Sequence, residues 1–142
     1  LAQIENITAV KEASGSLDQV SAIRRTTPPE FLIYSGDDSL TMPMMAVGAH
    51  GVVSVVGHVV GNEIQQMIKA ALDGRLAEAA RIHLDLVPVF KALFITANPI
   101  PVKAAVNMLG IEVGGLRPPL PPATEAELTV VRTVLKDLGK IQ

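Results

Sequence analysis

Lys11 is the residue of this sequence best placed for covalent chemistry, because it follows the largely β-branched run Ile7-Thr8-Ala9-Val10. A continuous apolar run of this kind predicts a buried strand of a parallel sheet. An apolar environment disfavours the ammonium form of a lysine, and the free amine is the form that attacks a carbonyl carbon. The position therefore suits a Schiff-base lysine, although a lysine at a strand end is more often a solvated charge at the mouth of a sheet.

Other polar residues fit structural roles better. Glu12 neighbours Lys11, but adjacent strand residues point to opposite faces, so Glu12 is a poor proton partner. Asp37-Asp38 suits the start of a helix, where free N–H groups favour anions, better than a metal site or an acid/base pair. His50, His58 and His83 do not have the spacing of metal ligands, so we expect no metal.

Three strand–helix units position these residues in the first half of the chain. The expected strands cover residues 6–11, 31–35 and 51–56, and the expected helices cover 17–25, 40–47 and 62–72. Strands alternating with helices over short loops are typical of parallel βα units. Chemistry in such folds gathers at the carboxyl ends of the strands, which is where Lys11 and Gly36-Asp37-Asp38 lie.

The second half of the chain is expected to be helical throughout. Helical spacing of apolar residues runs from Leu76 to Phe94, and further helices are expected at 101–109 and 124–138. Ser16 with Gln19, and Thr124 with Glu127, each match the capping-box pattern that opens a helix. We therefore divide the chain into two domains, 1–74 and 75–142.

Three parallel strands do not make a complete sheet protein, since two strands would each keep an unpaired edge. A (β/α)8 barrel needs eight strands and about 250 residues. The chain begins at Leu1 rather than Met, which suggests part of something longer. The predicted fold class is α/β: residues 1–74 form the last three βα units of a TIM (β/α)8 barrel, and residues 75–142 form an all-helical C-terminal domain.

Four blocks then point to a known family. They run from Ile4 to Gly15, from Tyr34 to Asp38, from Gly48 to Val55, and from Asn98 to Lys103. Together they resemble the dihydrodipicolinate synthase / N-acetylneuraminate lyase family, occur in family order and cover essentially the whole chain. Gly36-Asp37-Asp38 and the last block favour the lysine-biosynthesis members over the sialic acid lyases.

The resemblance implies a role for three residues. Lys11 matches the lysine that forms a Schiff base with pyruvate, and Gly36 matches a glycine beside the pyruvate pocket. Val53 matches a position whose backbone lines that pocket. The implied reaction joins pyruvate to aspartate 4-semialdehyde in the diaminopimelate pathway of lysine biosynthesis. No cofactor is expected, because the iminium itself withdraws electrons.

The resemblance also implies that this chain is incomplete as an enzyme. The family's proton-relay tyrosines, its threonine, its entrance arginine and its lysine-binding residues belong to the first half of the barrel. Tyr34 is the only tyrosine here and does not match a relay position. The expected partners are therefore the missing N-terminal half, a small aldehyde and further copies in a homotetramer.

Two alternatives remain open at this point. The chain could belong to another pyruvate-dependent aldolase, such as an N-acetylneuraminate lyase or a keto-sugar-acid aldolase. It could also be a non-catalytic half-barrel that binds a partner through its open edges.

Composition excludes several further classes. A net charge of −2 and 3% aromatic residues argue against nucleic acid as a partner. No apolar run reaches 18 residues, so no membrane span is expected. The absence of cysteine is consistent with a cytoplasmic protein.

Overall fold

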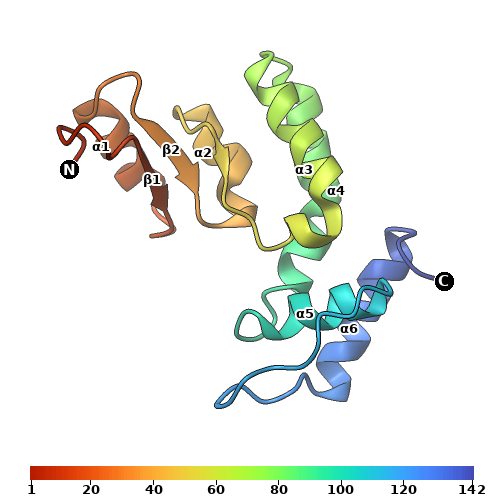
Figure 1. The fold of residues 1–142 in the computed structure, drawn as a ribbon. Coiled ribbons are helices and arrows are strands. Elements are labelled where there is room, and N and C mark those ends of the chain that lie inside the picture. The colour runs from red at the N-terminus through yellow and green to blue at the C-terminus, as the bar shows by residue number, and fades with distance from the viewer. The chain divides into compact units, whose positions relative to one another are not determined.

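The computed structural model describes all residues from Leu1 to Gln142. Strands occur only in the first part of the chain, and every element after them is a helix (Figure 1). The elements in chain order are β1 (Ala9–Glu12), α1 (Leu17–Thr26), β2 (Leu32–Ser35), η1 (Asp38–Leu40), α2 (Thr41–Ala46), β3 (Gly51–Val52), α3 (Gly57–Leu72), α4 (Leu76–Ala92), α5 (Ile100–Met108) and α6 (Glu125–Asp137).

The strands form one parallel sheet in the order β1-β2-β3. Ala9 pairs with Leu32 and Glu12 with Ser35, so β1 and β2 are paired over their full lengths. Helices connect consecutive strands, because parallel neighbours need a crossover connection. The mixed α/β class and the three parallel strands predicted from the sequence are confirmed.

All three strands are shorter than the sequence predicted, β2 by one residue and the other two by more. β1 begins at Ala9 rather than at residue 6, because Ile7 N–H donates to the Ile4 carbonyl in a preceding turn. β3 covers only Gly51–Val52 rather than residues 51–56. Its last bond to β2 runs from Val53 N–H to the Ser35 oxygen, where β2 ends, so the rest of the apolar run has no strand to pair with.

The helix after β3 begins earlier than expected, at Gly57 rather than at Asn62. The N–H groups of Val59 and Val60 both donate to the Val56 carbonyl, which starts helical turns within the run that we expected to be strand. The backbone leaves helical geometry at Val60, where φ is −125° and ψ is 39°. The expected helix start therefore corresponds to the stretch that follows this irregularity.

One face of the sheet packs against α1 and α2. The buried cluster contains Val20 from α1, Ile33 from β2, Met44 from α2 and Ala49, and Val10 of β1 packs against it. Met44 is fully buried, and its flexible side chain fills part of this core. This packing decides which strand residues face the helices and which face away.

The two predicted capping boxes behave differently. At α6, Thr124 Oγ1 accepts from Glu127 N–H while the Glu127 carboxylate accepts from Thr124 N–H, so the box is complete. At α1, Ser16 Oγ accepts from Gln19 N–H, but the Gln19 side chain does not return to the Ser16 backbone. Gln19 Nε2 instead donates to Glu12, so only half of that predicted box is present.

Exposed ion pairs flank the turn between α3 and α4. Gly74 takes a positive φ of 77°, and Asp73 beside it lies 3.1 Å from Lys69 and 3.0 Å from Arg75. The Arg75 hydrogen bond, followed by that of Lys69, lowers the pKa of the Asp73 carboxyl. Exposed pairs of this kind contribute little to stability. The turn therefore depends mainly on the positive φ of Gly74 and on helix packing.

Contacts divide the chain into two compact units. The first contains Leu1–Ser54 with Asn62–Leu84, and the second contains Val55–Gly61 with Asp85–Gln142. Within the second unit α5 packs on α6, and buried side chains include Ala105, Val131 and Leu135. The domain boundary after residue 74 that the sequence suggested stays a prediction.

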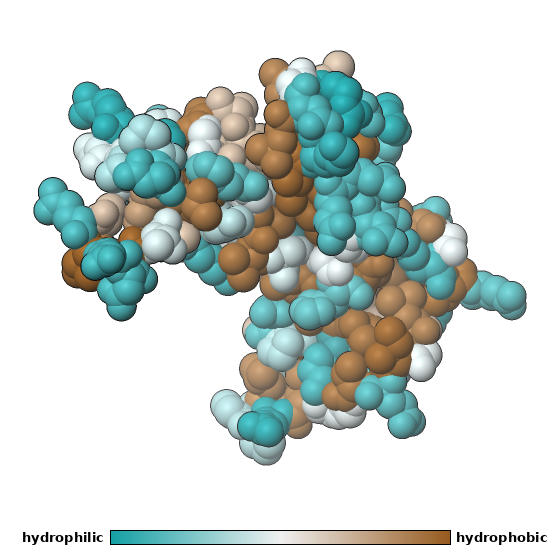
Figure 2. All heavy atoms as spheres, turned by 45° about the horizontal axis from the view of Figure 1, so that its top comes forward, coloured by the Kyte–Doolittle hydropathy of each residue, from teal (hydrophilic) through white to brown (hydrophobic).

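Apolar residues also reach the surface. Figure 2 shows brown, hydrophobic residues between teal ones on the face in view. The most exposed large apolar side chains are Leu1, Leu84, Leu72 and Ile111. Single exposed apolar side chains are common on folded proteins, so these alone identify no interface. None of the helices combines the length and apolarity needed to cross a bilayer.

Candidate functional site

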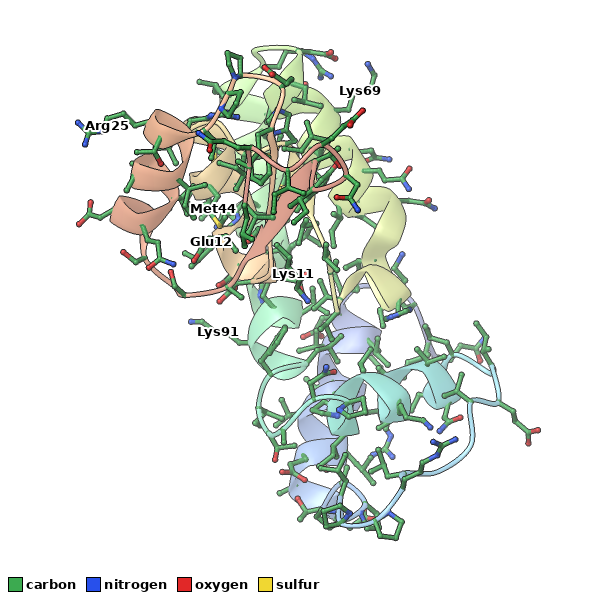
Figure 3. All side chains as sticks on the ribbon, turned by 60° about the vertical axis from the view of Figure 1, so that its left-hand side comes forward. Lys11, Glu12, Arg25, Met44, Lys69 and Lys91 are labelled. Atoms are coloured by element: carbon green, nitrogen blue, oxygen red, sulfur yellow. The ribbon has the colours of Figure 1, made fainter.

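β1 directs Lys11 away from the helices. Val10 and the buried Glu12 face the side that α1 and α2 cover, and strand alternation places Lys11 on the other side. In Figure 3 the Lys11 and Glu12 side chains leave the end of β1 in different directions. Lys11 is exposed in this chain, so the surroundings that would desolvate its amine are not formed by these residues.

Gly36 lies directly against the Lys11 side chain. Its N–H donates to the Glu12 carbonyl at 2.6 Å, which fixes the residue beside the end of β1. A Cβ atom at Gly36 would lie 2.6 Å from the Cβ of Ala13 and 3.0 Å from the Cε of Lys11. The absence of a side chain at this position therefore makes room for the lysine.

Val53 lies one strand farther along the sheet. Its N–H donates to the Ser35 carbonyl at 2.8 Å, which holds its backbone at the carboxyl end of β2. Its side chain is 48% exposed. Lys11 is the penultimate residue of β1, whereas Gly36 and Val53 directly follow β2 and β3. Lys11 and Gly36 are the two in close contact.

The loop after β2 is tied to its surroundings by acidic side chains. Asp37 caps η1, with its Oδ1 accepting from Ser39 N–H at 2.9 Å. Asp38 is buried and its Oδ1 accepts from the hydroxyl of Ser54, which follows β3. Capping by Asp37 is confirmed, whereas the Asp38–Ser54 contact was not expected from the sequence.

Tyr34 is the cross-strand neighbour of Lys11, but its ring points toward β3 rather than toward Lys11. The register pairs Lys11 with Tyr34, so both belong to the same side of the sheet. The Tyr34 ring atoms lie 3.5 Å from where a Cβ at Gly51 would be, so the ring packs over β3. Lys11 forms none of the ion pairs in the structure. The candidate nucleophile Lys11 therefore has no acid/base partner among these ion pairs.

Glu12 has a role that sequence reasoning missed. The residue is 4% exposed, and its Oε1 accepts from Ser14 N–H at 2.9 Å and from Gln19 Nε2 at 3.1 Å. These bonds tie the end of β1 to the start of α1. A glutamine seven residues after a strand-end glutamate was the only signal for this contact in the sequence.

The histidines occupy separate positions. His50 Nδ1 accepts from Ile33 N–H at 3.3 Å, His58 is exposed at the start of α3, and His83 lies on α4. Burial lowers the pKa of His83. No group of three His, Cys, Asp or Glu side chains is placed to hold a metal ion.

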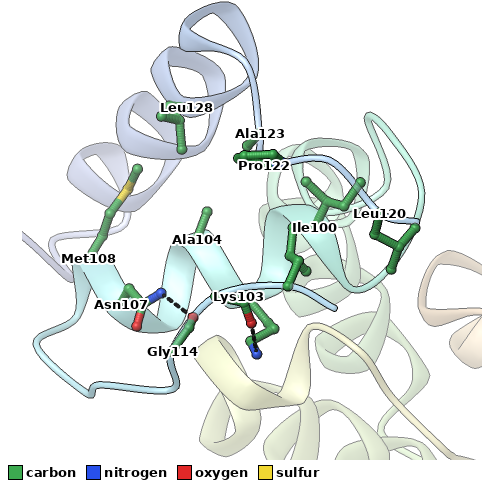
Figure 4. A pocket seen from close by; sticks show the side chains of 12 residues that line it. Ile100, Lys103, Ala104, Asn107, Met108, Gly114, Leu120, Pro122, Ala123 and Leu128 are labelled. Carbon is green, nitrogen blue, oxygen red and sulfur yellow. Dashed lines mark hydrogen bonds between the residues drawn. The ribbon is translucent and has the colours of Figure 1, made fainter. Parts of the chain in front are cut away.

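A separate cavity of about 480 Å³ lies in the second unit (Figure 4). Its walls are mainly apolar and include Met108 and Leu128. The polar side chains at its edge are occupied, since Lys103 Nζ donates to the Gly115 carbonyl and Asn107 Nδ2 to the Gly114 carbonyl. This cavity offers no nucleophile, and Lys103 receives no catalytic role.

Comparison with curated proteins identifies close relatives. Residues 1–138 match the Dihydrodipicolinate synthetase family. A protein from Heliobacterium modesticaldum named 4-hydroxy-tetrahydrodipicolinate synthase is 55% identical over 139 residues, covering 98% of this chain and 46% of the relative. A protein of the same name from Acaryochloris marina is 57% identical over 139 residues, covering 98% and 47%.

Solved structures agree with this result. A dihydrodipicolinate synthase from Aquifex aeolicus superimposes with a TM-score of 0.94 at 43% identity, covering 97% of this chain and 47% of the other. The enzyme from Cyanidioschyzon merolae with lysine bound gives 0.93 at 48% identity, covering 96% and 46%. The enzyme from Acinetobacter baumannii complexed with pyruvate gives 0.93 at 32% identity, covering 99% and 48%.

The chain spans about half the length of the relatives that it matches. Within that half the match is continuous and reaches from the first residue to the last helix. The resemblance inferred from the four sequence blocks is therefore confirmed, and the chain belongs to the dihydrodipicolinate synthetase family.

Proposed function

We propose that this chain forms the C-terminal part of a lyase that condenses pyruvate with aspartate 4-semialdehyde through a Schiff base on Lys11. In this proposal β1, β2 and β3 are the last three strands of a TIM barrel, and the helices from residue 75 onward form a C-terminal domain. The reaction is a step of lysine biosynthesis by the diaminopimelate pathway.

The observation that supports the proposal most strongly is the placement of Lys11. It stands at the carboxyl end of a parallel strand, on the side away from the helices, in contact with a glycine that leaves it space. The carboxyl ends of barrel strands carry the catalytic groups of TIM-barrel enzymes. The name of the relatives, and the pyruvate in the Acinetobacter baumannii structure, support pyruvate as the substrate in this proposal.

The amine of Lys11 would attack the C2 carbonyl carbon of pyruvate, and loss of water would leave a protonated imine. The iminium withdraws electrons, so a proton leaves the pyruvate methyl group and an enamine forms. The enamine carbon then attacks the aldehyde carbon and makes the new carbon–carbon bond. The new alkoxide takes up a proton, and the product is again an imine on Lys11. Water, or the amino group of the aldehyde substrate, then attacks the imine carbon and displaces the Lys11 nitrogen, which returns the free amine without any oxidant or reductant.

Gly36 and Val53 would shape the pyruvate site. The contact distances around Gly36 leave no room for a side chain between Lys11 and Ala13. Val53 would contribute its backbone, which its bond to Ser35 already holds in place at the end of β2. Neither residue donates or removes a proton in this scheme.

The acid/base groups and the remaining strands would come from the half of the relatives that this chain does not cover. Tyr34 packs over β3 and is not assigned to proton transfer. We also propose a homo-oligomer, most simply a homotetramer, in the cytoplasm, because the family resemblance implies both.

A chimera tests the proposal. The uncovered half of the Heliobacterium modesticaldum relative is joined ahead of Leu1, and condensation of pyruvate with aspartate 4-semialdehyde is measured. We expect the chimera to be active, the chain alone to be inactive, and Lys11→Ala to lose activity by at least about 1,000-fold, because it removes the covalent route. Lys91→Ala, which alters an exposed lysine of α4, should remain active (Figure 3).

The full-length Heliobacterium modesticaldum protein serves as the positive control for the assay. A chimera that folds with the circular dichroism and thermal midpoint of that protein, yet retains activity after Lys11→Ala, contradicts the assignment. A folded chimera that consumes pyruvate only with a different aldehyde would instead point to another pyruvate-dependent aldolase.

A further inference from the structure

The buried carboxylate of Glu12 fastens the turn that follows Lys11. Its Oε1 accepts two hydrogen bonds, one from the backbone of Ser14 and one from the side chain of Gln19 on α1. The series of hydrogen bonds continues at Ser14, whose Oγ accepts from Ser16 N–H at 3.2 Å. Ser16 in turn caps α1. A continuous set of hydrogen bonds therefore runs from the strand end to the helix start.

This turn contributes one wall of the space around the lysine. Ala13 lies between Glu12 and Ser14, and its Cβ is the atom nearest to the position that a Gly36 Cβ would occupy, at 2.6 Å. The Lys11 Cε is next, at 3.0 Å. Ala13 and the Lys11 methylenes thus border the same narrow space, so a shift of the turn changes the room available to the amine.

Glu12 cannot act on Lys11 by direct proton transfer from this position. Its carboxylate faces α1, and the Lys11 side chain leaves the opposite side of the strand. The two donors to its Oε1 are neutral amide N–H groups, and it forms none of the ion pairs in the structure. The contacts therefore act on the backbone geometry next to the nucleophile.

We propose that Glu12 is a positioning residue, which holds the turn through Ala13 so that the Lys11 amine meets the substrate carbonyl in a reactive geometry. The inference rests on the proposed Schiff-base function of Lys11 and adds a residue outside the substrate site. Misplacement of reacting groups by about 1 Å can cost about 100-fold in rate.

Glu12→Ala and Glu12→Gln separate geometry from charge. Both are made in the chimera, and the first-order rate constant for borohydride-trapped adduct formation is measured at saturating pyruvate. Glu12→Ala should lower it by about 10-fold to 100-fold. Glu12→Gln keeps the Oε1 acceptor and should stay within about threefold of the parent, because a neutral acceptor forms a somewhat weaker hydrogen bond.

Gln19→Ala provides a second route if Glu12→Ala does not fold. Gln19 is exposed, so its replacement leaves the core intact while removing one of the two bonds to Glu12. It should slow adduct formation by about threefold to 10-fold, less than Glu12→Ala does, because the Ser14 bond remains. Gln65→Ala, at an exposed position on α3, is the matched control and should not change the rate.

The outcomes distinguish the two proposals. A parent chimera that forms no adduct at Lys11 overturns the proposed function. If the parent chimera forms the adduct and Glu12→Ala or Gln19→Ala forms it at the same rate, the positioning role is overturned. A Glu12→Gln variant as slow as Glu12→Ala overturns it as well, since charge rather than the hydrogen-bonded turn would then matter. A lower thermal midpoint with an unchanged rate in the folded protein shows a merely structural role.

Discussion

At the scale of single residues, the site depends on what is absent at one position. In the proposed reaction Lys11 reaches the substrate, and the missing side chain at Gly36 leaves space beside the Lys11 methylenes. Backbone bonds hold that space, because Gly36 N–H donates to the Glu12 carbonyl. The lysine and the glycine come from different strands and meet only because β1 and β2 are paired in this register.

Gly36→Ala should therefore damage the site more than the fold. The new Cβ would stand 2.6 Å from Ala13 and 3.0 Å from Lys11, so the turn or the lysine must move. We expect a loss of stability of about 1–3 kcal/mol from overpacking and a drop of about 100-fold in the rate of adduct formation. Urea denaturation and borohydride trapping of the chimera measure the two effects.

Gly61→Ala is the control for that substitution. A Cβ at Gly61 meets no atom within 4 Å, and the residue lies in α3, where alanine is favoured over glycine by about 1 kcal/mol. The rate of adduct formation in Gly61→Ala should equal that of the parent chimera. Equal rates in Gly36→Ala and Gly61→Ala would show that the space beside Lys11 has no role.

At the scale of elements, local patterns predicted most of the fold. Apolar runs located all three strands, and Lys11 was placed correctly near a strand end. The end of β3 was not predictable from its own residues, because it depends on where β2 stops at Ser35. The Gln19 contact with Glu12 was not predicted for a similar reason, because the local sequence around Gln19 already matched a capping box.

The complete capping box of α6 gives a measurable contribution to stability. Thr124→Ala removes the Oγ1 that accepts from Glu127 N–H, which should lower the free energy of unfolding by about 1 kcal/mol. Thr133→Ala is the matched control, because Thr133 lies exposed within the same helix and bonds only to the Thr129 carbonyl. Thermal or urea unfolding of the chain measures both variants, and an equal effect would contradict the capping role.

The same box makes stability depend on pH in a defined direction. Hydrogen bonds from the Thr124 backbone and then its hydroxyl lower the pKa of Glu127 from its ordinary value of 4.5. The charged carboxylate is favoured in the folded state, so its contribution is complete above pH 4.5 and is lost as pH falls through the lower folded value.

Glu127→Gln isolates that effect. The difference in free energy of unfolding between the parent and Glu127→Gln should be constant above pH 4.5 and shrink progressively below it. Glu125→Gln, which alters a first-turn residue outside the box, corrects for general helix electrostatics. A difference that stays unchanged down to pH 2 contradicts the assigned pKa direction.

At the scale of the whole molecule, the sheet order leaves one edge of β1 and one edge of β3 unpaired. Unpaired strand edges are ready to accept further strands. The relatives are about twice as long as this chain. Lys11 faces the side of the sheet that neither α1 nor α2 covers. If the proposed barrel is correct, we expect its remaining half to pair with these edges and to enclose the amine.

Reductive trapping tests the central claim most directly. The chimera is incubated with pyruvate and borohydride, digested, and analysed by peptide mass spectrometry, with Lys11→Ala and Lys91→Ala treated in parallel. We expect one pyruvate adduct per subunit, on the peptide that contains Lys11. This adduct should be present in Lys91→Ala and absent in Lys11→Ala. An adduct on any other lysine, or none in a folded chimera, would contradict it.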